Sequence, residues 1–154
     1  MSPAKKIKIG IIGLGHLGKI HLQQWMQIPT AQVIGVFDIH SETLKQVAET
    51  HKVKAYQQVE DLINDADALD IVTPTNYHFY YAEKAIKKFK HIFIEKPVTE
   101  TLHEAKKLMD LATEANIKAQ VGHVERFNPA FLAINNMVLS PRFIEVHRLA
   151  CLLY

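Results

Sequence analysis

Short apolar runs alternate with amphipathic segments along most of this 154-residue chain. The runs indicate buried strands over Ile7–Ile12, Val33–Phe37, Ala68–Val72, His91–Ile94 and Ile117–Val121. Between them, apolar residues recur at spacings of three and four, which gives each segment one apolar helical face. This alternation predicts an α/β fold, a doubly wound parallel sheet with helices on both faces. We also expect a short strand near residues 54–56 and a short helix around residues 59–63.

The pattern changes after Gly122. Asn128 and Pro129 are typical of a helix N-cap and first turn, and they predict a helix that runs to about Leu139. Residues 143–154 predict a single apolar strand, which cannot form a stable domain without a partner. We therefore expect residues 1–123 to form one domain and residues 124–154 to be only the start of a second α/β domain.

Composition narrows the function classes. The formal net charge is +2 and the lysines are scattered, so nothing indicates a nucleic-acid partner. Cys151 is the single cysteine, which excludes an internal disulfide and fits a reducing, cytoplasmic compartment. The sequence shows neither a signal peptide nor an apolar segment long enough to span a membrane, so no membrane partner is expected. The histidines lack metal-ligand spacing, so no metal is expected.

The sextet GLGHLG, residues 13–18, has the spacing G-x-G-x-x-G, follows a predicted strand and opens a predicted helix. Such a turn offers backbone N–H groups and the positive end of a helix dipole to phosphates. Asp38 ends the next strand, 20 residues past Gly18, where a carboxylate can accept hydrogen bonds from a ribose. Together they predict a Rossmann domain that binds NAD; NADP is disfavoured because Asp38 would repel its 2′-phosphate. The alternatives are a purely structural turn, or a methyltransferase or flavin domain.

Polar residues also end the next two strands. Thr73 and Thr75 can donate hydroxyls at the carboxyl edge of the sheet, and His78 begins the following helix. Lys96 follows the next strand and can exchange a proton with a substrate oxygen or stabilise an alkoxide. Glu95 can pair with it or contact the nicotinamide ribose. The structural alternatives are that Pro74 only ends a strand and Asn76 only caps a helix, and that Glu95 and Lys96 form a solvated ion pair.

Residues 120–129, QVGHVERFNP, follow the last parallel strand. Gly122 would allow close approach to a ligand. His123 is a candidate acid or base, and Arg126 suits an anionic or polyhydroxyl substrate; a structural histidine and a surface ion pair are the alternatives. The residues expected to contact the cofactor are Gly13, Leu14, Gly15, His16, Leu17, Gly18, Asp38, Thr73, Pro74, Thr75, His78, Glu95, Lys96 and Gln120.

The segments IGIIGLGHLGKIH, TPTNYH, FIEKPVTET and QVGHVERFNPA, in this order, resemble the glucose–fructose oxidoreductase / inositol dehydrogenase / MocA (Gfo/Idh/MocA) family. The resemblance implies a Rossmann domain followed by an α/β domain with a large open sheet. It implies NAD(P)-dependent oxidation or reduction of sugars, cyclitols or sugar nucleotides. It also implies that Lys96 is the catalytic lysine, that Glu95 contacts the nicotinamide side, and that the Lys96–Pro97 bond is cis.

Members of that family are longer, and their second domain supplies a catalytic histidine from an Asp-x-x-x-His motif. No such motif follows residue 129 here. We therefore expect this chain to bind NAD but to turn over weakly or not at all alone, and to form a homo-oligomer through residues 142–154. Two alternatives stay open: a non-catalytic NAD-binding regulatory module, and a reductase of another small molecule such as a bilin or an imine.

Overall fold

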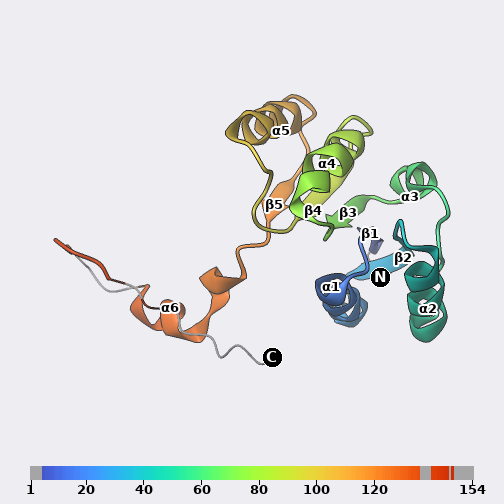
Figure 1. Ribbon diagram of the computed structural model, residues 1–154, viewed down its shortest axis with the longest axis horizontal. Coiled ribbons are helices and arrows are strands. Elements are labelled where there is room, and N and C mark those ends of the chain that lie inside the picture. Colours follow the sequence, from blue (N-terminus) through green and yellow to red (C-terminus); the bar gives the residue numbers. More distant parts are fainter. Residues whose placement is uncertain (1–4, 136–139, 146, 148–154) are drawn as a thin grey trace. The chain divides into compact units, whose positions relative to one another are not determined.

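The computed structural model describes residues 5–135, 140–145 and 147, which fall into two compact units, one ending at His123 and one beginning at Val124. The first unit alternates strands and helices along the chain (Figure 1). Its elements are β1 (Ile7–Ile12), α1 (His16–Gln27), β2 (Ala31–Phe37), α2 (Ser41–His51), α3 (Val59–Asp65), β3 (Ala68–Ile71), η1 (Thr75–Tyr77), α4 (His78–Ile86), β4 (His91–Ile94), α5 (Leu102–Glu114) and β5 (Ala119–Val121).

The five strands are all parallel and lie in the order β2-β1-β3-β4-β5. The strand order reverses between β1 and β3, because the chain builds outward from β1 in both directions. In an open α/β sheet, ligands bind outside the carboxyl ends of the strands at such a reversal. The turns that follow β1, β2, β3 and β4 all reach this edge, so the sheet gathers four separate motifs there.

Each face of the sheet has its own apolar core. Ile9 and Ile11 of β1 belong to a cluster with Leu22 of α1 and Val47 of α2. Ile12, the next residue, belongs instead to a cluster with residues of α3, α4 and α5. This alternation of period two is what a strand buried on both faces produces. The helices are thus held on both faces, and the predicted doubly wound α/β fold is confirmed.

The predicted strands at residues 7–12 and 91–94 have the bounds that the structure gives to β1 and β4. The expected strand near residues 54–56 is wrong in extent, because it is reduced to a single bridge between Ala55 and Val36. Lys54 instead stacks over the ring of Tyr56, 3.9 Å from its centroid. A segment this short adds no further strand to the sheet.

The second unit contains η2 (Val124–Phe127) and α6 (Pro129–Ile134). Asn128 caps α6 by accepting a hydrogen bond from the N–H of Ala130 at 3.0 Å, as the sequence predicts. The helix ends earlier than expected, and residues 136–139 lie outside the described residues. Of the predicted strand over 143–154, residues 143–145 and 147 form no strand, and the rest lie outside the described residues. Among the described residues, none of the helices has the length and apolar character to cross a membrane.

Candidate functional site

The turn between β1 and α1 leaves no room for side chains at two of its glycines. Gly13 has a φ of +96°, and an added Cβ would lie 2.8 Å from the carbonyl oxygen of Val72. An added Cβ on Gly18 would lie 2.0 Å from the carbonyl oxygen of Gly13. At Gly15, by contrast, an added Cβ would meet no atom within 4 Å. Gly13 and Gly18 therefore shape the turn, whereas Gly15 keeps the space before it open.

The Asp38 carboxylate, just after β2, is held by two backbone amides. The N–H of Leu14 donates to Oδ2 at 2.7 Å, and the N–H of His40 donates to Oδ1 at 2.8 Å. The first contact ties the glycine turn to the end of β2. Each carboxylate oxygen has a second lone pair, so Asp38 keeps the capacity to accept hydrogen bonds from a ligand.

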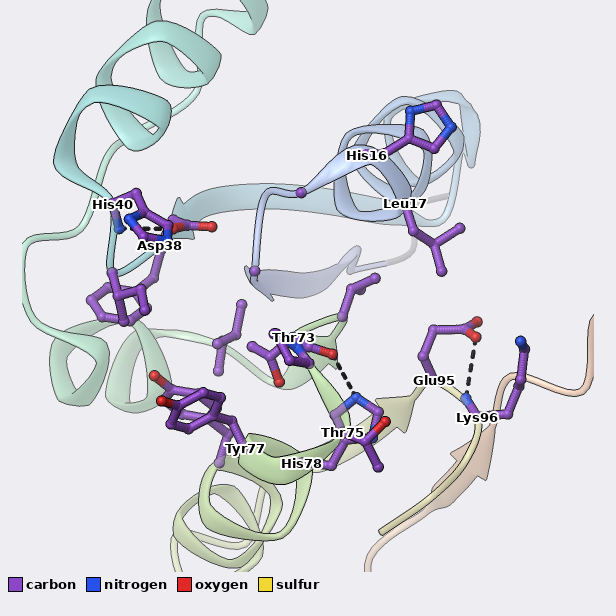
Figure 2. A pocket seen from close by; sticks show the side chains of 18 residues that line it. His16, Leu17, Asp38, His40, Thr73, Thr75, Tyr77, His78, Glu95 and Lys96 are labelled. Atoms are coloured by element: carbon purple, nitrogen blue, oxygen red, sulfur yellow. Dashed lines mark hydrogen bonds between the residues drawn. The ribbon is translucent and has the colours of Figure 1, made fainter. Parts of the chain in front are cut away.

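A cleft of about 430 Å³ lies along the carboxyl edge of the strands. Figure 2 shows Asp38 and His40 at one end of it, Glu95 and Lys96 at the other, and the turn after β3 between them. Tyr77 and Tyr81 line it from α4 and the turn before it, with ring centroids 6.5 Å apart. Burial, and then the charges of Tyr80, Tyr77 and Asp38, raise the pKa of the Tyr81 phenol.

The turn after β3 contributes a buried hydroxyl. Thr73 lines the cleft, and its Oγ1 is buried without a hydrogen-bond partner among the residues that the structure describes. His78 holds this turn, because its Nε2 lies 2.8 Å from the carbonyl oxygen of Thr73 (Figure 2). Its Nδ1 lies 2.9 Å from the carbonyl oxygen of Pro97.

Glu95 and Lys96 follow β4 at the far end of the cleft. Glu95 is 8% exposed, and its Oε2 accepts a hydrogen bond from the backbone N–H of Lys96 at 3.1 Å. The Lys96 side chain is exposed, and the Lys96–Pro97 peptide bond is cis. Gly122 makes room for Glu95, because an added Cβ there would lie 2.2 Å from Oε1. The close approach at Gly122 is therefore made by a side chain of this protein.

Most of the residues expected to contact a cofactor come together at this cleft. Those that line it are Gly13, Gly15, His16, Leu17, Asp38, Thr73, Pro74, Thr75, His78, Glu95 and Lys96. Leu14 is fully buried in the core, and its backbone N–H is used by Asp38. Gln120 lines a separate pocket between α5 and β5, so the fold does not bring it to the cleft.

Two other candidates are not among the residues that line the cleft. His123 is exposed and does not line the cleft; its backbone N–H donates to the carbonyl oxygen of Val121. Arg126 is an exposed residue of η2 in the second unit, so its relation to the cleft stays a prediction. In the part of the chain that the structure describes, no cluster of His, Cys, Asp and Glu could hold a metal ion.

Sequence reasoning missed several residues. Tyr77 and Tyr81 line the cleft, and the available signal was two tyrosines four residues apart at the start of a helix that begins at the carboxyl edge. Asp70 was also missed, although a carboxylate inside an otherwise apolar strand is unusual. None of these three residues has a motif around it, so only the fold shows what each one faces.

Comparison with known proteins agrees with this geometry. Residues 7–123 match the family described as "Oxidoreductase family, NAD-binding Rossmann fold" (GFO_IDH_MocA). The chain is 38% identical over 145 residues to UDP-N-acetylglucosamine 3-dehydrogenase of Acidithiobacillus ferrooxidans, covering 94% of this chain and 46% of that protein. A solved structure of that enzyme has a TM-score of 0.81, covering 84% of this chain and 42% of the other.

Apo scyllo-inositol dehydrogenase from Lactobacillus casei is similar as well, with a TM-score of 0.80 and 30% identity over 87% of this chain and 41% of that one. The chain thus spans less than half the length of these relatives. The matched region includes the glycine turn, Asp38, the turn after β3 and the Glu95–Lys96 pair. On this evidence the chain belongs to the Gfo/Idh/MocA oxidoreductase family, and residues 7–123 are its NAD-binding Rossmann domain.

Proposed function

We propose that this chain binds NAD(H) in the cleft and forms the cofactor-binding part of an enzyme that oxidises or reduces a sugar, a cyclitol or a sugar nucleotide. The observation that carries the proposal is the lining of the cleft. A fixed carboxylate and an open glycine turn flank it on one side, and Glu95 and Lys96 flank it on the other. A dinucleotide offers matching groups to each of these.

The residues present fit NAD. Gly13 and Gly15 would admit the pyrophosphate to the turn before α1, whose first amides no side chain caps. Asp38 would accept hydrogen bonds from the adenosine ribose and would repel a 2′-phosphate, which favours NAD over NADP. Thr73 would donate its hydroxyl to the cofactor, with Thr75 beside it. Tyr77, Tyr81 and the apolar residues near Asp38 supply a wall for the adenine.

The chemistry divides among few groups. The bound nicotinamide supplies the hydride acceptor or donor. Lys96 would pass a proton to or from the reacting oxygen, or stabilise the alkoxide as an ammonium. Glu95 would accept a hydrogen bond from a ribose or substrate hydroxyl. His123 as an acid or base and Arg126 as a contact to an anionic or polyhydroxyl substrate remain part of the proposal, supported by their place in the sequence after β5.

The substrate class is supported by the relatives, which are named for a sugar nucleotide and a cyclitol. Among these, a sugar nucleotide is our preferred proposal, because the relative of that name is 38% identical over most of this chain.

Calorimetric titration of the chain with NADH, and then with NADPH, tests the proposal. We expect tight binding of NADH and poor binding of NADPH. The Lys96→Ala variant should bind NADH within about threefold of the unchanged chain, because the lysine serves the substrate oxygen. Preference for NADPH would overturn the role of Asp38. Binding of neither dinucleotide would overturn the proposed function of this chain.

A further inference from the structure

Asp70 lies in β3 and is fully buried. Its Oδ2 accepts a hydrogen bond from the indole Nε1 of Trp25 at 2.6 Å and lies 2.9 Å from Nδ1 of His21. Both partners come from α1, so the helix supplies two donors to a carboxylate in the sheet. A buried charge needs such partners. The chemistry proposed for the cleft does not use this pair.

The opposite edge of the His21 ring faces Glu95, a residue of the cleft. Nε2 of His21 lies 3.5 Å from Oε1 of Glu95. The side chain of His21 is 15% exposed, and the ring of Phe93 packs edge-on against it with centroids 5.9 Å apart. His21 therefore connects a carboxylate of the core with a carboxylate of the cleft, in surroundings that water hardly reaches.

The protonation of His21 follows from its two neighbours. An ionised carboxylate can only accept hydrogen bonds, so both ring nitrogens face acceptors. A neutral imidazole has one N–H and would turn a lone pair toward one carboxylate, whereas an imidazolium has two N–H groups and satisfies both. Burial acts to lower the pKa of His21, but the hydrogen bond to Asp70 and the negative charges of Asp70 and Glu95 outweigh it and raise this pKa above its ordinary value.

We propose that His21 is a positioning residue: an imidazolium held between Asp70 and Glu95 that fixes the Glu95 carboxylate at the Lys96 end of the cleft. The other Glu95 oxygen accepts the Lys96 backbone N–H, and Gly122 leaves the space in which the carboxylate lies. Elements from three parts of the chain thus orient one anion. Its role as acceptor for a ligand hydroxyl rests on the proposed function.

The ring ¹⁵N and ¹H signals of the histidines, followed from about pH 5.5 to about pH 9, test this clamp of Asp70, His21 and Glu95 without any cofactor. The titratable groups that face His21 in the described chain are Asp70 from β3 and Glu95 after β4, while Trp25 and Phe93 are neutral. We expect His21 to lose its second ring proton only above pH 6.5, the ordinary pKa of a histidine. Loss of that proton at or below pH 6.5 would overturn the proposal.

The Glu95→Gln variant tests the coupling, because it keeps the size of the side chain and removes its charge. We expect the pKa of His21 to fall, because the negative charge of Glu95 is one of the causes that raise it. An unchanged titration of His21 would show that Glu95 does not belong to the clamp and would overturn the proposal.

Cofactor affinity tests the positioning. We expect His21→Gln to weaken NADH binding about tenfold and the matched control His103→Gln to leave it unchanged. If His21→Gln does not fold, Gly122→Ala serves instead, since it displaces the Glu95 carboxylate and leaves the Asp70–His21 pair intact. Unchanged affinity in the folded variants would overturn the positioning role. A chain that binds no NADH while His21 still titrates with Glu95 would refute the proposed function and support the clamp.

Discussion

Alanine substitutions at Gly15 and Gly18 distinguish the glycine that faces the ligand from the glycine that shapes the turn. At Gly15, the backbone φ is −61° and an added Cβ would meet no atom within 4 Å. Alanine therefore fits without strain and restricts the unfolded chain, which stabilises a protein by about 0.4–1 kcal/mol. The same methyl group would stand in the open space before the turn. We expect Gly15→Ala to be as stable as the unchanged chain or slightly more so, yet to bind NADH at least about tenfold more weakly.

Gly18→Ala should do the opposite to stability. The added Cβ would lie 2.0 Å from the carbonyl oxygen of Gly13, where ordinary contact begins at 3.4 Å, so the turn must shift by about 1.4 Å. The obstacle is backbone and cannot rotate away. Overpacking of this kind costs about 1–3 kcal/mol, or about 4–12 °C in the midpoint of thermal unfolding for a domain of this size.

Circular dichroism during heating gives the stability of both variants, and calorimetric titration gives their NADH affinity. If the Gly15→Ala variant unfolds at a much lower temperature than the unchanged chain, the space at Gly15 is not open. Gly15→Ala with unchanged NADH affinity would show that no ligand approaches the turn there. Gly18→Ala with an unchanged midpoint would refute the close packing of the turn.

Three further predictions concern other parts of the chain. Asp38→Asn should improve the affinity for NADPH relative to NADH by about tenfold, as calorimetry can measure with Asp110→Asn, an exposed acid on α5, as the control for net charge. Thr101→Ala removes the acceptor of the capping box of α5 and should cost about 1 kcal/mol in chemical denaturation, whereas Thr113→Ala, which loses only a bond to the carbonyl of its own helix, should cost less. Because the pKa of His21 is raised in the folded chain, its contribution to stability is full below its ordinary value of 6.5 and is lost as the pH rises through the folded value. The difference in melting midpoint between the unchanged chain and His21→Gln should therefore be larger at about pH 6 than at about pH 9, and the reverse order would refute the charged state of His21.

Much of the fold could be predicted because buried parallel strands carry their own signal. β1 and β4 are mostly apolar, and each is followed by a glycine or a polar residue, so their bounds are visible in the sequence. The glycine turn and Asp38 were identified because a strand, a turn and a helix must follow one another at fixed spacing. Local patterns of this kind predict single elements and the turns between elements that follow one another in the chain.

Features that depend on distant residues could not be predicted. His21 and Asp70 are 49 residues apart, and nothing in either segment indicates that α1 packs on β3 so that these two side chains meet. Gln120 was expected at the cleft but lines a pocket between α5 and β5, because the three-residue strand β5 is too short for its pattern to show which edge and face a side chain reaches. The role of Gly122 likewise depends on the side chain of Glu95, which comes from a different strand end.

The two amides that hold Asp38 bear on how selective the cleft is. A surface carboxylate ordinarily samples several rotamers, and ordering it when a ligand binds costs side-chain entropy. Asp38 is already fixed by Leu14 and His40, so a ribose diol would meet a prepared acceptor at little entropic cost. The same fixation prevents the side chain from turning away to accommodate a bulkier ribose. Discrimination at this end of the cleft would therefore come from rigidity as much as from charge, and loosening the turn would broaden the choice of cofactor even with the aspartate in place.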